Sequence, residues 1–87
     1  MQDKNLILQK AIGRVINKVR KQKDLKFTLF CYENDISKTT LYMIEKGKNK
    51  PYVTSLFEII KALGLTYKEF GELLDNELPK NYWDSED

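Results

Sequence analysis

The spacing of hydrophobic residues along the first quarter of the chain predicts an α-helix. From about Lys4 to about Lys23, apolar residues recur every three or four positions, as on the buried face of a helix; they are Leu8, Ile12, Val15, Ile16 and Val19. The other face is basic and carries Lys10, Arg14, Lys18 and Lys21. A helix with this pattern packs one side against the rest of a small domain.

A shorter apolar cluster follows, and it is interrupted by residues suited to a turn. The cluster begins at Phe27, includes Cys31 and stops at Asn34-Asp35. Asn and Asp tolerate the left-handed backbone conformation that a tight turn demands. The sequence therefore predicts a helix of about two turns followed by a sharp turn.

A third helix is predicted after Ser37, whose hydroxyl can accept a hydrogen bond from a backbone N–H two or three residues later. Leu41 and Ile44 give this helix an apolar stripe, and Gly47 can end it. Pro51 restricts the residue before it to extended conformations, so a polar loop is expected ahead of it.

Two further helices are predicted, each opening with a capping box. The first box is Ser55–Glu58, and the helix after it buries Leu56, Ile59, Ile60 and Leu63 before ending at Gly64. The second box is Thr66–Glu69, and it opens a shorter fifth helix whose apolar side carries Phe70, Leu73 and Leu74.

The hydrophobic pattern fails from Asp75 onward. Residues 76–87 contain one lysine and four carboxylates, and only Leu78, Tyr82 and Trp83 are suited to packing. The chain has no useful run with the two-residue period of a strand. We therefore predict an all-α protein, with a five-helix domain over residues 1–75 and an acidic C-terminal tail over residues 76–87.

Composition excludes several classes of function. The sequence has no histidine and a single cysteine, Cys31, so it holds no Ser-His-Asp or Cys-His catalytic set and no ligand set for a Cys/His zinc site. The one adjacent pair of carboxylates, Glu86-Asp87, lies at the end of the tail, so no acid/base pair within a pocket is suggested. We expect no enzyme, no metal and no cofactor.

Hydropathy argues against a membrane protein. No stretch approaches the ~18 consecutive apolar residues of a membrane helix, and the N-terminus lacks the apolar run of a signal peptide. The expected location is the cytoplasm.

The net charge of +2 conceals two halves of opposite sign. Residues 1–50 hold 12 Lys and Arg against 5 Asp and Glu, a net of +7, whereas residues 51–87 hold 3 against 8, a net of −5. If the chain binds a polyanion, the basic half is where it would bind.

The stretch from Phe27 to Glu45 meets the requirements of two helices that cross at a sharp angle. Such a pair needs a small residue at the crossing, a turn that accepts positive φ, and apolar residues that hold the second helix to the domain. Cys31 supplies the first and Asp35 the second, and the third is met by Ile36, Leu41 and Ile44.

Residues 12–74 resemble the Cro/repressor-type helix-turn-helix domain, also called the XRE family. Its most recognisable segment is matched by Ile44-Glu45-Lys46-Gly47-Lys48 and Pro51, and its opening by Ile12-Gly13, Ile16 and Arg20. The resemblance implies a compact five-helix, lambda-repressor-like fold in which helices two and three form the helix-turn-helix. One departure stands at Phe27, where the family usually has a glutamine that touches a phosphate.

The resemblance implies a set of DNA contacts on the third helix and the loop after it. An α-helix fits the major groove, and the side chains expected to point at base edges are Lys38, Thr39, Tyr42 and Met43. Phosphates would be held by Thr28, Thr40, Lys46, Lys48, Asn49 and Lys50. Arg20 and Glu45 resemble a structural ion pair of the family, which joins the first helix to the end of the third.

The resulting expectation is a sequence-specific DNA-binding transcriptional regulator, a dimer that represses at a two-fold-related operator on double-stranded DNA. A stand-alone Cro-like repressor, a restriction-modification controller and an antitoxin that represses its own operon are all compatible with this expectation. Candidate dimer contacts are Phe70, Leu73, Leu74, Tyr82 and Trp83. The alternative is a protein-interaction module on the same fold, an antitoxin or adaptor that binds a protein partner through its acidic, aromatic tail.

Overall fold

The computed structural model describes residues 3–84, and over this range it contains five α-helices and no strand. The helices are α1 (Lys4–Gln22), α2 (Phe27–Glu33), α3 (Lys38–Glu45), α4 (Val53–Ala62) and α5 (Tyr67–Glu77). The prediction of an all-α, five-helix fold is confirmed.

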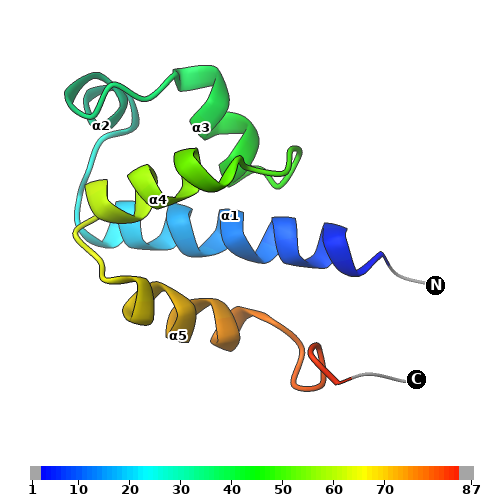
Figure 1. Cartoon of the computed structure of the whole chain (residues 1–87). Coiled ribbons are helices and arrows are strands. Elements are labelled where there is room, and N and C mark those ends of the chain that lie inside the picture. The colour runs from blue at the N-terminus through cyan, green and yellow to red at the C-terminus, as the bar shows by residue number, and fades with distance from the viewer. Residues whose placement is uncertain (1–2, 85–87) are drawn as a thin grey trace.

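Helix α1 lies between the other elements and joins the two sides of the molecule. Figure 1 shows α2 and α3 on one side of it and α5 on the opposite side, and α1 packs against both α3 and α5. The contact with α3 requires a glycine, because a Cβ at Gly13 would stand 2.4 Å from the carbonyl oxygen of Ile44 and 2.7 Å from that of Glu45. Gly13 therefore allows the end of α3 to lie directly against the backbone of α1.

The core gathers the apolar faces that the sequence pattern predicts. One cluster joins residues of all five helices around Ile16 and Leu41, which are fully buried. Its other buried members are Ile12, Val15, Val19, Phe30, Cys31, Ile44, Ile59, Ile60, Leu63 and Phe70. This shared core fixes the position of α3 relative to the rest of the chain.

Two of the three predicted helix caps are present. The Ser37 hydroxyl accepts a hydrogen bond from the backbone N–H of Thr40 at 3.3 Å, and Thr66 with Glu69 forms a complete capping box. The third, at Ser55, is wrong. Helix α4 begins two residues earlier at Val53, and its N-cap residue Tyr52 makes no side-chain capping bond. The first residues of α4 are therefore exposed and uncapped, and its core-facing side begins with Leu56, Ile59 and Ile60.

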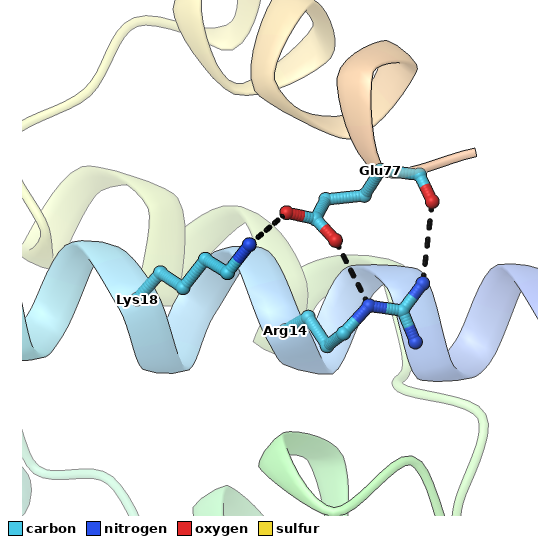
Figure 2. A network of polar contacts seen from close by, with 3 residues as sticks. All are labelled: Arg14, Lys18 and Glu77. Carbon is cyan, nitrogen blue, oxygen red and sulfur yellow. Dashed lines mark hydrogen bonds and ion pairs between the residues drawn. The ribbon is translucent and has the colours of Figure 1, made fainter.

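The predicted end of the fifth helix is also wrong. Helix α5 continues to Glu77, so the expected division between residues 75 and 76 falls inside it. Its last turn is held by contacts with α1: the Glu77 carboxylate accepts from Arg14 Nε at 2.9 Å and from Lys18 Nζ at 2.5 Å, and its carbonyl accepts from Arg14 Nη2 at 3.2 Å (Figure 2). Partners this far apart in sequence leave no trace in hydrophobic periodicity.

Part of the predicted tail packs against the domain. Leu78 and Tyr82 are buried with Ala11 in a second small cluster on α1. The Tyr82 hydroxyl donates to the carbonyl oxygen of Lys4 at 2.6 Å, and the Lys4 ammonium lies 5.1 Å from the centre of the Tyr82 ring. Residues 78–82 therefore extend the folded domain. Glu86 and Asp87 lie outside the described residues.

Candidate nucleic-acid interface

Helices α2 and α3 are joined by the turn that the sequence predicts. Asp35 has φ of +55°, in the left-handed region, and the backbone N–H of Ile36 returns to the carbonyl of Cys31 at 2.9 Å. Cys31 is buried at the crossing of the two helices. Burial first, and the nearby Glu45 carboxylate second, raise the pKa of the Cys31 thiol, which favours an uncharged core residue.

A buried ion pair ties α1 to the end of α3. Arg20 binds Glu45 through two nitrogens, at 2.7 and 3.1 Å, and both side chains are less than one-tenth exposed. Arg20 also donates to the carbonyl of Leu25, and Asn17 donates to the Glu45 carboxylate at 2.8 Å. Because both charges have several hydrogen-bond partners, the pair fixes the angle of α3 without leaving a buried charge unpaired.

The Arg20–Glu45 pair also accounts for Phe27, which stands where the resembled family usually has a glutamine. This side chain is half-buried, and the Arg20 guanidinium lies 5.3 Å from the centre of its ring. Phe27 therefore covers one face of the ion pair and packs against the core at the start of α2. The Phe27 ring thus stabilises the start of α2 by packing against the core, whereas a glutamine at this position would make a polar contact at the surface.

The outward face of α3 presents most of the residues that the sequence analysis assigns to base reading. Lys38, Thr39 and Tyr42 are exposed, and Met43 is half-buried. The Lys46 ammonium lies 5.7 Å from the centre of the Tyr42 ring, one turn further along the helix. The exposed part of this face is polar and cationic, as suits a helix entering the major groove.

The loop between α3 and α4 brings together three of the predicted phosphate-binding residues. Thr40, Asn49 and Lys50 line one hollow of about 140 Å³, together with Tyr52 and Ser55. Thr28, Lys46 and Lys48 are exposed around α2 and the end of α3. Because α4 has no side-chain cap, the first backbone N–H groups of that helix remain available beside this hollow.

Solved structures share this geometry. The chain is similar to the restriction-modification controller protein C.Esp1396I, with 27% identity over 80% of this chain and 92% of that chain, and a TM-score of 0.74. It matches the same protein solved as a tetramer in complex with its natural 35 base-pair operator, with 27% identity, the same coverage and a TM-score of 0.75. This chain has the Cro/repressor-type helix-turn-helix fold.

No protein-family model matches the sequence, and comparison with curated proteins gives no significant match. Within residues 3–84, this helix-turn-helix domain has no group of three or more Cys, Asp or Glu residues arranged to hold a metal ion. No helix in that range is long and apolar enough to cross a membrane.

The five candidate dimer residues fall into two groups. Phe70 and Tyr82 are buried by the chain's own helices, so in this structure neither is available to a partner. Leu74 is half-buried, whereas Leu73 and Trp83 are exposed. Periodicity alone does not separate these cases, because a residue on an apolar stripe faces the core or a second chain with equal regularity.

A further exposed apolar surface lies where α4 meets α5. The rings of Phe57 and Tyr67 are 4.8 Å apart, and 44% and 53% of the two residues, respectively, remain exposed. We call this pair the aromatic ledge. The sequence pattern does not predict it, because Phe57 and Tyr67 lie inside the two expected capping boxes, Ser55–Glu58 and Thr66–Glu69.

Two further residues line the hollow between α3 and α4 and are not predicted by the sequence. Tyr52 and Ser55 line it because α4 starts earlier than the capping pattern indicates. No local sequence signal marks this start, because the N-cap residue Tyr52 is extended and makes no side-chain capping bond.

Proposed function

We propose that this protein is a sequence-specific DNA-binding transcriptional regulator that places α3 in the major groove of double-stranded DNA. The observation that carries the proposal is the exposed face of α3, which is fixed in angle by the buried Arg20–Glu45 pair and bordered by a lysine-bearing loop. Similarity to a controller protein solved on its operator supports it.

In this proposal the exposed residues divide into two roles. Lys38, Thr39, Tyr42 and Met43 read base edges, because they lie on the outward face of α3. Thr28, Thr40, Lys46, Lys48, Asn49 and Lys50 hold phosphates and position the protein without reading sequence.

The proposal is tested by selection from a pool of random duplexes at physiological salt. We expect an enriched, roughly palindromic motif. Lys38→Gln is expected to relax preference at one base pair, by about 1–3 kcal/mol of discrimination. Lys48→Gln is the matched control: it should weaken binding to all sequences alike and reduce the salt slope by about one. Recovery of no motif with the wild-type chain contradicts the proposed function.

We further propose that the protein acts as a repressor in the form of a homodimer. A dimer of such domains binds two half-sites about one helical turn apart. The aromatic ledge is the candidate contact, supported by Leu73 on α5, because two exposed rings side by side are costly to leave in water.

The dimer surface is tested by sedimentation analysis of two charge-introducing variants. Tyr67→Glu places a carboxylate in the aromatic ledge and should convert dimers to monomers. Tyr32→Glu is the control, because Tyr32 on α2 is 83% exposed and lies outside the ledge. An unchanged dimer in Tyr67→Glu excludes the ledge as the contact.

One observation favours an additional protein partner. Trp83 is 65% exposed and packs edge-on against Tyr82, next to the acidic residue Asp84. An exposed indole beside a carboxylate suits a basic, partly apolar protein surface. Trp83→Ala should abolish capture of such a partner while DNA binding is retained; capture by both chains alike argues against this role.

A further inference from the structure

Lys46 combines two properties that a phosphate-binding lysine does not need. Its ammonium lies 5.7 Å from the centre of the Tyr42 ring, and its backbone N–H donates to the Tyr42 carbonyl at 3.0 Å. The two residues are four positions apart on α3, so their side chains share one face of the helix. Lys46 is thus joined to Tyr42 through both its backbone and its side chain.

The backbone around Lys46 is held in place on its C-terminal side. Lys46 is the C-cap residue of α3, and buried Gly47 follows it with φ of +69°. The N–H of Gly47 donates to Ile44 and that of Lys48 donates to Met43, at 3.0 and 2.9 Å. Because this turn is fixed, the Lys46 stem starts from a defined point and returns along the helix toward Tyr42.

Tyr42 lies at the surface of α3. It is 47% exposed, and within residues 3–84 its hydroxyl makes no hydrogen bond with a side chain or the backbone. The ring would otherwise move between rotamers at the surface of α3. A cation above the ring selects one orientation before DNA arrives, which lowers the entropy lost on binding.

We propose that Lys46 is a positioning residue for base reading: its ammonium holds the Tyr42 ring in the orientation that contacts base edges. This inference rests on the proposed function. It assigns to Lys46 an influence on sequence preference beyond the sequence-independent phosphate contact given above. Lys38, Tyr42 and Lys46 form a row at intervals of four residues, in which the central ring is held from its C-terminal side.

The inference is tested by selecting sequences from random duplexes with single and double variants. Tyr42→Leu should first identify the base pair that the ring reads. Lys46→Gln should weaken binding to all sequences and also reduce preference at that same base pair, by about two- to fivefold, as expected for the loss of an exposed cation–π contact. Lys46→Arg retains a cation over the ring and should keep the preference.

Lys48→Gln is the matched control, because Lys48 is an exposed lysine two residues along that lies over no described ring. It should lower affinity without changing preference at any base pair. In the Tyr42→Leu background, Lys46→Gln should have only this uniform effect. All the substituted side chains are exposed, and thermal unfolding followed by circular dichroism checks that each variant is folded.

The inference is overturned if Lys46→Gln leaves the wild-type preference intact and behaves like Lys48→Gln. It is also overturned if Tyr42→Leu alters no base preference. Both results leave the proposed function standing, since the wild-type chain would still select a motif. Failure of the wild-type chain to select any motif is a different result, and it contradicts the proposed function itself.

Discussion

Gly13 controls how closely α1 and α3 approach, and it does so through backbone atoms alone. A methyl group at this position would meet two carbonyl oxygens of α3, those of Ile44 and Glu45, at 2.4 and 2.7 Å. Backbone oxygens at the end of a helix cannot rotate away as a flexible side chain can. The crossing would have to open, and the Arg20–Glu45 ion pair beside it would stretch.

We therefore expect Gly13→Ala to lower the free energy of unfolding by about 1–3 kcal/mol, the usual cost of overpacking a core contact. Gly71→Ala is the matched control, because a Cβ at Gly71 would meet nothing within 4 Å. That substitution should stabilise α5 by about 0.5–1 kcal/mol, since alanine favours a helix over glycine. Urea unfolding of both variants measures the difference. Equal effects would contradict the role given to Gly13.

At the scale of single residues, the sequence predicts those roles that depend on neighbouring positions in the chain. Asp35 in the turn and Ser37 at the cap adopt the roles predicted for them, because each role depends on neighbours within a few positions. The position of Phe27 over Arg20 was not predictable, since it depends on a partner in another helix.

At the scale of elements, hydrophobic periodicity finds all five helices and misplaces two of their ends. The start of α4 is misplaced because Ser55 and Glu58 fit a capping pattern that the chain does not use. The end of α5 is misplaced because Glu77 is held by Arg14 and Lys18, about sixty residues away in the sequence. Local caps place the starts of α3 and α5, whereas the end of α5 depends on a tertiary contact.

The contacts of Glu77 make the end of α5 sensitive to acid. Hydrogen bonds from Lys18 first and Arg14 second lower the pKa of the Glu77 carboxyl below its ordinary value (Figure 2). A group whose pKa is lowered by folding stabilises the folded state above its unfolded pKa, and this stabilisation is lost as the pH falls through the folded pKa. The relevant window therefore begins near pH 4.5 and extends downward.

We expect Glu77→Gln to be less stable than the wild-type chain at neutral pH, by up to about 1 kcal/mol, because Arg14 and Lys18 are largely exposed and screened by water. The difference should shrink as the pH falls below 4.5 and as salt is added. Urea unfolding at several pH values measures it. Glu72→Gln is the control, because Glu72 is an exposed glutamate on the same helix. A difference that grows on acidification would contradict this account of Glu77.

At the scale of the whole molecule, the two oppositely charged halves of the sequence meet on α1. Glu77, from the acidic half, pairs with Arg14 and Lys18, so part of the basic face of α1 is neutralised within the chain. The lysines on and after α3 belong to no ion pair among residues 3–84. Lys38, Lys46, Lys48 and Lys50 are exposed and therefore keep their positive charge available to a polyanion.

Because part of the acidic C-terminal segment packs against α1, deleting the segment would remove packing as well as charge. A chain ending at Asp75 would lose Glu77, Leu78 and Tyr82, and would expose Ala11 on α1. Such a truncation should destabilise the fold, so its DNA binding would report folding as well as charge. Neutralising the three terminal carboxylates, Asp84→Asn, Glu86→Gln and Asp87→Asn together, removes charge while leaving the packed residues in place.

We expect this triple variant to unfold at the same urea concentration as the wild-type chain and to bind non-specific duplex DNA more tightly at low salt. The reason is that three negative charges no longer repel the phosphates. The gain should be less than about tenfold and should fade near 0.1 M salt, where the Debye length is about 10 Å. Fluorescence anisotropy with a duplex that lacks the selected motif measures it. Unchanged affinity at low salt would mean that these carboxylates lie too far from the DNA to oppose its binding.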